Sequence, residues 1–194
     1  QKWDVTNIEV KTKSVLTHTV SNTGVGAFNK NGDGIDGELE DPNKIKINLV
    51  ERKTWRIPVC YDKFFSKDLD NISTSLNLSR NQIIKLHHEN KYMVCFLGFL
   101  PGFLYLSNLN KKLYFPRKSV PDLSVAKGSV GIGGSQTGVY PSDSPGGWNI
   151  IGNSPVNFIN TSTDEISFAQ PGDLIKFYPI TLEEHQVILK ESNK

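Results

Sequence analysis

Several side chains between Phe96 and Pro155 are of types that bind or transform a small molecule. Arg117 follows a proline in a basic segment, and a guanidinium there is suited to clamp a carboxylate or a phosphate with two parallel hydrogen bonds. The hydroxyl of Ser129 and the amide of Gln136 are suited to donate to a carbonyl or an oxyanion. We therefore expect this stretch to bind a ligand that carries an anionic group and a carbonyl.

Large aromatic side chains accompany these polar groups. The same stretch holds most of the chain's 16 glycines and 10 prolines, which is too many for a helix interior or a long regular sheet. Rings beside turns, with a few polar groups among them, are the usual lining of small-molecule pockets. The aromatic residues that we expect to contact a ligand are Phe99, Tyr105, Tyr140 and Trp148.

A catalytic group is assigned less directly by the sequence. His87 ends an expected helix, where a histidine often only interacts with the helix dipole, so a structural and a catalytic role both stay open. Ser129 would need a base as a nucleophile, and the sequence gives it no histidine partner. We expect no metal: no histidine pair has ligand spacing with an acid, and a solvated turn explains the calcium-like spacing of Asn29 to Glu40.

Short strands, turns and two helices must position these groups. Residues 54–61 alternate like a strand, and Pro58 places that strand at an edge or a strand end. Residues 92–97 form a nearly continuous apolar run, which predicts a buried strand. A glycine-rich run at 128–138 lacks the spacing of a phosphate-binding loop.

Two helix starts are expected between residues 66 and 90. Ser66 is a candidate cap for a helix that carries Leu69 and Ile72 at helical spacing. Ser79 and Gln82 have the spacing of a capping box for a second helix. We reject a DNA-binding helix pair, because the second helix offers few basic contacts and no basic arm lies beside it.

Composition limits the class of protein. The chain has 194 residues, 37% hydrophobic and 22% charged, and a formal net charge of +2, which gives no support for nucleic-acid or membrane binding. It shows no charged and apolar leader and no apolar run of about 20 residues. Cys60 and Cys95 lie in apolar runs, where buried reduced thiols are the default, so we expect a cytoplasmic location.

Three motifs carry a resemblance to a known family: Gly98-Phe99-Leu100-Pro101-Gly102-Phe103, Gly128-Ser129-Val130-Gly131-Ile132, and Ser144-Pro145-Gly146-Gly147-Trp148. They resemble the signature of the KipI family, also called allophanate hydrolase subunit 1, which includes the B subunit of bacterial 5-oxoprolinase. The resemblance covers residues 53–185. Two basic positions of the family differ here, since Asp122 and Asn153 stand where the family usually has arginine.

The resemblance implies a mainly β fold with short helices. Residues 51–194 would form a cyclophilin-like β-barrel domain, and residues 1–50 a short or incomplete α+β segment before it. It carries no prolyl isomerase activity with it, because a shared fold does not imply a shared function.

The resemblance also implies a function. It is that of the B subunit in an ATP-dependent 5-oxoprolinase, which hydrolyses 5-oxo-L-proline to L-glutamate together with two partner subunits, one KipA-like and the other LamB/YcsF-like. In that reading the complex consumes ATP, and this subunit is inactive without its partners. Two alternatives stay open: an inhibitor of a sensor histidine kinase, as in KipI, and a module that processes urea or allophanate.

Overall fold

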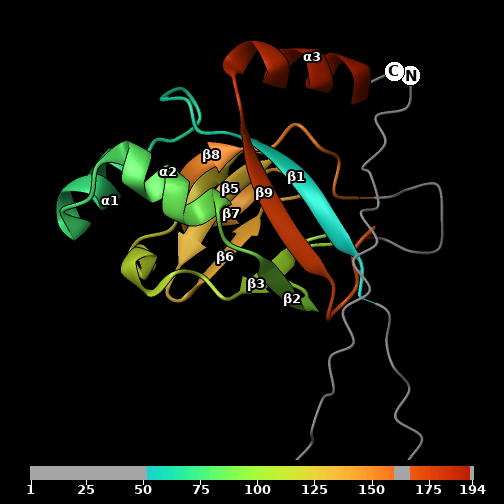
Figure 1. The fold of residues 1–194 in the computed structure, drawn as a ribbon, viewed down its shortest axis with the longest axis horizontal. Coiled ribbons are helices and arrows are strands. Elements are labelled where there is room, and N and C mark those ends of the chain that lie inside the picture. Colours follow the sequence, from blue (N-terminus) through green and yellow to red (C-terminus); the bar gives the residue numbers. More distant parts are fainter. Residues whose placement is uncertain (1–51, 160–166, 193–194) are drawn as a thin grey trace, which may run out of the picture. The chain divides into compact units, whose positions relative to one another are not determined.

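Seven strands form a closed barrel in the computed structural model, which describes residues 52–159 and 167–192. The expected N-terminal segment at 1–50 and the loop at 29–40 lie outside the described residues. The mainly β fold with a barrel, expected from the sequence, is confirmed. In pairing order the barrel strands are β1 (Thr54–Cys60), β8 (Asn149–Asn153), β5 (Ser129–Gly133), β6 (Gln136–Val139), β3 (Leu104–Ser107), β2 (Tyr92–Leu97) and β9 (Leu174–Ile180) (Figure 1).

The smaller elements lie outside the barrel wall. Strands β4 (Asp122–Val125) and β7 (Ser144–Gly146) pair with each other in a separate two-stranded sheet. The described helices are α1 (Leu69–Leu76), α2 (Arg80–His88) and α3 (Leu182–Ser192), with a 3₁₀ turn at Lys111–Leu113. None of the described helices is long and apolar enough to span a membrane.

The barrel closes between the first and last described strands. β1 and β9 run parallel and pair from Thr54 with Leu174 to Cys60 with Ile180. Pro58 lies inside β1 rather than at an edge or strand end, which corrects the expectation. On its other side β1 pairs with β8 only through Cys60 and Asn153, so much of that side makes no ladder bonds with the strands that the structure describes and tolerates a proline.

The core fills the barrel interior. Alternate residues of β9, Ile175 and Phe177, are fully buried and meet Ile57 of β1. The prediction that residues 92–97 form a buried strand is correct on one face only, because Tyr92 and Val94 are buried while Met93 is exposed. A shift in register between Val94 and Phe96 leaves Phe96 48% exposed as well. Their neighbour Cys95 is also exposed, so the expectation of two buried thiols holds for Cys60 alone.

The helix pair begins as expected at one of its two starts. In the capping box of α2, the Gln82 N–H donates to Ser79 Oγ and the Ser79 N–H donates to Gln82 Oε1. Ser66 does not cap α1, whose N-cap is Asp68; its hydroxyl donates instead to the Asp62 carbonyl at 2.8 Å.

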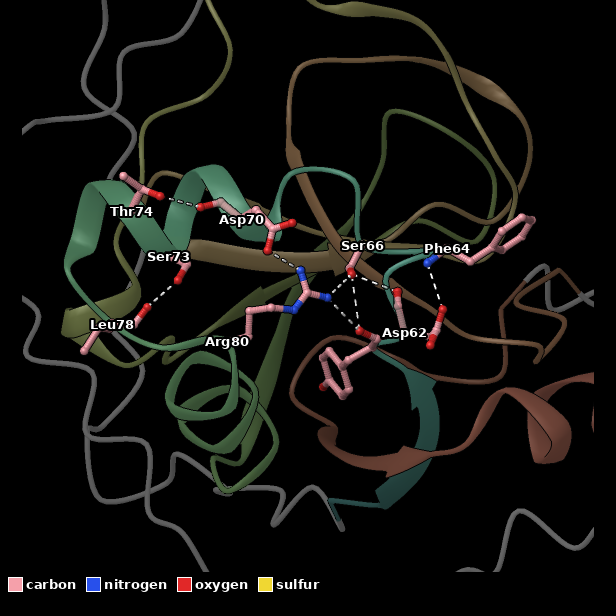
Figure 2. Close-up of polar contacts among 9 residues, drawn as sticks. Asp62, Phe64, Ser66, Asp70, Ser73, Thr74, Leu78 and Arg80 are labelled. Atoms are coloured by element: carbon pink, nitrogen blue, oxygen red, sulfur yellow. Dashed lines mark hydrogen bonds and ion pairs between the residues drawn. The ribbon is translucent and has the colours of Figure 1, made fainter.

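Arg80 at the start of α2 joins the second helix to the loop before the first (Figure 2). Its guanidinium donates to Ser66 Oγ at 2.8 Å and to Asp70 Oδ1 at 2.6 Å. A weaker contact reaches the Tyr61 carbonyl at 3.4 Å. One side chain therefore fixes the segment between β1 and α1, which carries Phe64 and Phe65.

Candidate functional site

Trp148 packs directly against the backbone at two glycines, Gly133 and Gly138. A Cβ on Gly133 would stand 2.5 Å from the indole Nε1, and one on Gly138 would stand 3.1 Å from Cζ3. Both glycines belong to the β5–β6 hairpin, so the glycine-rich run serves to seat a buried indole. Any larger residue at Gly133 would push the ring out of its place.

Four further rings pack around Trp148 and one another. Phe103 makes edge-to-face contacts with Trp148, with centroids 5.5 Å apart, and with Tyr140 at 5.3 Å. Tyr105 stands 5.8 Å from Trp148, also edge to face. Burial raises the pKa of the Tyr140 phenol, so its hydroxyl stays protonated at neutral pH. The result is a rigid aromatic wall.

Phe99 marks the rim of this wall. Its φ of 68° lies in the left-handed region, which is rare for a bulky residue and is found where the surroundings hold the backbone in place. A turn holds it here, in which the Phe103 N–H donates to the Leu100 carbonyl at 3.0 Å. The ring is 60% exposed and stands edge to face with Phe103 and Tyr140.

Two adjacent cations have different partners. The Arg117 guanidinium lies over the Trp148 ring, with Cζ 5.5 Å from the centroid. Lys118 Nζ is bound by Asp68 at 2.8 Å and by Asp122 at 2.7 Å. Burial disfavours the Asp122 carboxylate, but hydrogen bonds from Lys118 and Lys67 outweigh burial and lower the pKa of Asp122. Asp122, one of the two positions where the motifs of the resemblance usually have arginine, thus belongs to an ion-pair network.

These groups line one pocket of about 350 Å³. It brings together five of the residues singled out from the sequence, while their role in binding stays a prediction. Lys118 is a lining residue that sequence reasoning passed over, although it belongs to the same basic segment as Arg117. We name this hollow the Trp148 pocket; the five residues are Phe99, Tyr105, Arg117, Tyr140 and Trp148.

His87 lies elsewhere, in the core. The Thr137 hydroxyl donates to the Gly131 carbonyl, so it accepts from His87 Nε2 at 2.9 Å. The Tyr61 hydroxyl then donates to Nδ1 at 2.8 Å. Complete burial, and to a lesser degree the nearby His88, lowers the pKa of His87 to about 3. Both ring nitrogens are occupied, which indicates a structural role instead of a catalytic one.

Ser129 and Gln136 do not line the Trp148 pocket. Ser129 is buried at the start of β5 and lines a second, larger cavity. Gln136 is half-buried in the β5–β6 hairpin, where it pairs with Gly133. The expected donors to a carbonyl are therefore not gathered beside Arg117.

Sequence reasoning missed His185, which lines the second cavity with Ser129. Its Nε2 is 2.8 Å from Asn153 Oδ1, a partner 32 residues away in the sequence. No local signal announces such a contact, because it depends on where α3 lies against the barrel. Among residues 52–159 and 167–192, no group of three or more His, Cys, Asp or Glu side chains is placed to hold a metal ion.

Comparison with known proteins settles the family. Residues 32–169 match the model for the carboxyltransferase domain, subdomain C and D. The chain belongs to this family. The match begins at residue 32, earlier than the motifs that carried the resemblance.

Two curated relatives are similar in sequence to most of the chain. The B subunit of 5-oxoprolinase from Bacillus subtilis (strain 168) is 40% identical over 144 residues, which are 74% of this chain and 60% of that protein. Its counterpart from Escherichia coli O157:H7 is 38% identical over 156 residues, 73% of this chain and 72% of that protein. The resemblance seen in the motifs is confirmed.

The chain is also similar to a solved structure. A conserved uncharacterized protein from Pyrococcus horikoshii shares 43% identity with a TM-score of 0.65. The likeness covers 68% of this chain and 61% of that one. As with the Bacillus relative, the matched region spans about three fifths of the longer protein's length.

Proposed function

We propose that this chain is the B subunit of an ATP-dependent 5-oxoprolinase, a complex that hydrolyses 5-oxo-L-proline to L-glutamate. The relatives of that name support the proposal. The observation that carries it is the Trp148 pocket, where the Arg117 guanidinium stands above an indole among aromatic rings. A planar cation beside apolar faces suits a small acid with an apolar ring.

The pocket has the size and the groups that this substrate needs. Its volume of about 350 Å³ lies near the lower end of the usual range for ligand pockets, roughly 300–1,000 Å³. Arg117 would hold the carboxylate of 5-oxoproline in two-pronged geometry. The lactam ring would rest on the aromatic wall formed by Phe103, Tyr105 and Trp148.

The reaction explains the need for ATP and for partners. An unstrained lactam resists water, so hydrolysis is driven by transfer of a phosphoryl group from ATP to the carbonyl oxygen. Water then adds to the carbon and the ring C–N bond breaks, which leaves an acyl phosphate and a free amine. A second water hydrolyses the acyl phosphate to the carboxylate and phosphate. Arg117 would offset negative charge that develops nearby. The KipA-like and LamB/YcsF-like partners would supply the rest of the site.

Reconstitution tests this proposal. The purified chain, mixed with both partner subunits, 5-oxo-L-proline and ATP, should release glutamate and ADP together. Arg117→Ala should raise the KM for 5-oxoproline about tenfold or more, because a charged hydrogen bond contributes about 1.5–3 kcal/mol. Lys111→Ala, at an exposed residue of the same basic segment, should leave the KM unchanged.

Two outcomes would count against it. A mixture of all three subunits that releases no glutamate would remove the proposed activity. Glutamate release with an unchanged KM in the Arg117→Ala variant would keep the activity but place substrate binding outside the Trp148 pocket.

A further inference from the structure

His185 differs from the other histidine of the described core in one respect. The Asn153 amide group donates to the Lys127 carbonyl at 2.9 Å, so the Asn153 oxygen is left to face His185. His185 Nε2 must then carry the hydrogen, and Nδ1 bears a free lone pair. His185 therefore presents a hydrogen-bond acceptor on its other edge.

That acceptor has no donor within residues 52–159 and 167–192. His185 is 3% exposed, and its Nδ1 is covered and unpaired there, whereas both nitrogens of His87 are bonded. Burial lowers the pKa of His185, which keeps the ring neutral and Nδ1 an acceptor near pH 7. A buried unpaired acceptor is unfavourable, and a donor brought by a ligand would relieve it.

The ring stands at the wall of a cavity of about 720 Å³, well within the range of ligand sites. The cavity shares no lining residue with the Trp148 pocket. Its wall combines apolar surface from Phe65 and Leu189 with the Ser129 hydroxyl. Two lysines, Lys67 and Lys127, also line it, and its described lining contains no acidic residue.

A half-buried ring from the loop before α1 lies against His185. Phe65 packs on the imidazole, with centroids 4.4 Å apart and planes tilted by 39°. The loop that carries Phe65 is tied to α2 through Arg80 and Ser66, as Figure 2 shows. These bonds restrain the backbone of this loop, so the Phe65 side chain is the part of it that can rotate away from the imidazole.

We propose that this second cavity, the His185 cavity, binds a small amide or lactam whose N–H donates to His185 Nδ1 and whose carbonyl accepts from Ser129. The lysines disfavour an amine as the donor and tolerate an added carboxylate. The proposal concerns a different cavity from the Trp148 pocket, and it stands whether or not the chain acts in a 5-oxoprolinase.

A matched pair of probes tests the donor. The full chain, with ¹⁵N-labelled histidine, is titrated with 2-pyrrolidinone and with N-methyl-2-pyrrolidinone, which lacks the N–H. The first should shift the His185 Nδ1 signal with saturation, and the second should bind about tenfold more weakly, the loss expected for one hydrogen bond to a buried acceptor. The His87 signals serve as an internal control and should not move.

Three variants then locate the binding. Ser129→Ala should weaken binding of 2-pyrrolidinone several-fold, and Phe65→Ala should preserve or strengthen it. Arg117→Ala should leave it unaltered, because Arg117 lines the other pocket. None of these changes removes the bond between His185 and Asn153, so α3 keeps its anchor.

The proposal is overturned if 2-pyrrolidinone leaves the His185 signal unmoved at every concentration at which the protein stays folded, or if both probes bind equally. It is also overturned if Arg117→Ala abolishes the shift, since the probe would then be reporting from the Trp148 pocket. Failure of glutamate release in the reconstituted complex would not bear on any of these readouts.

Discussion

His87 and Trp148 show how single side chains depend on the atoms around them. Complete burial lowers the pKa of His87 and keeps its ring neutral, and in that state the Tyr61 hydroxyl donates to one nitrogen and Thr137 accepts from the other. A second proton on the imidazole would leave the Tyr61 hydroxyl facing another donor. Trp148 depends on the absence of side chains on the hairpin beneath it. Each arrangement predicts the effect of a small chemical change.

Acid should weaken the fold through His87. Its pKa is about 3 in the folded protein and about 6.5 in an unfolded chain. The stabilisation is complete above pH 6.5 and is lost as the pH falls toward 3, because only the unfolded chain takes up the proton in that interval. Stability should drop by up to about 1.4 kcal/mol per pH unit, and His185, whose pKa is also lowered, adds in the same direction.

Urea unfolding of the parent and of His87→Asn at several pH values checks this. The variant should be less stable at pH 7, because it leaves Tyr61 or Thr137 without a partner at a cost of about 1–3 kcal/mol. The difference between the two proteins should shrink as the pH falls to 4.5. A difference that stays constant across this range would contradict the assigned role.

Gly133→Ala should disturb the Trp148 pocket. The new Cβ would lie 2.5 Å from the indole, so the ring or the strand has to shift, at a cost of about 1–3 kcal/mol. Gly147→Ala is the matched control, because the nearest atom to its Cβ would be 3.7 Å away. Urea unfolding and tryptophan fluorescence should change in the first variant only; equal effects in both would contradict the packing argument.

At the scale of elements, local patterns were predictable and tertiary contacts were not. The capping box of Ser79 and Gln82 could be predicted because its two bonds span one helical turn. The apolar run at 92–97 misled, since Met93 and Cys95 face outward and a shift in register after Val94 exposes Phe96 too.

The candidate site divides in the same way. Aromatic residues that flank turns in one stretch of sequence do share the Trp148 pocket. Ser129 lies apart from them because it pairs with Asn153 of β8 at the start of β5. Both residues line the second cavity, together with His185 of α3. The partner of His185 could not be predicted, because Asn153 reaches it only after the barrel and α3 are in place.

Ser79→Ala should destabilise the start of α2, and with it the protein, by about 1 kcal/mol. The change removes the hydroxyl that accepts from the Gln82 N–H, and with it one half of the capping box. Ser135→Ala, at an exposed turn residue, should change the free energy of unfolding by less than about 0.5 kcal/mol. Thermal or urea unfolding distinguishes them. Indistinguishable stabilities would show that the capping box contributes little.

At the scale of the whole molecule, the barrel is closed by its first and last strands. β1 and β9 pair along their full lengths, and Phe177 of β9 is fully buried in the common core. α3 follows β9, and His185 is its buried residue. The two C-terminal elements therefore differ sharply in how much of the fold depends on them.

Truncation should expose this difference. A chain that ends at Ile180 loses α3 and the His185 bond but keeps the barrel, and should still unfold cooperatively at a somewhat lower urea concentration. A chain that ends at Asp173 loses β9 and with it the closing ladder and the inward side chains. Near-UV circular dichroism should be lost in the second chain alone; a native-like spectrum there would show that closure is dispensable.

The contact between Lys53 and Asp173, which are 120 residues apart, means that the barrel cannot close until long after β1 has been synthesised. At translation rates of about 5–20 residues per second, β1 leaves the ribosome roughly 6–24 s before its long-range partner is made. During that interval an unpaired edge and an unfilled interior stay open to other nascent chains. Chaperones that shield such edges, rather than faster local folding, should therefore govern the yield of the native barrel in the cell.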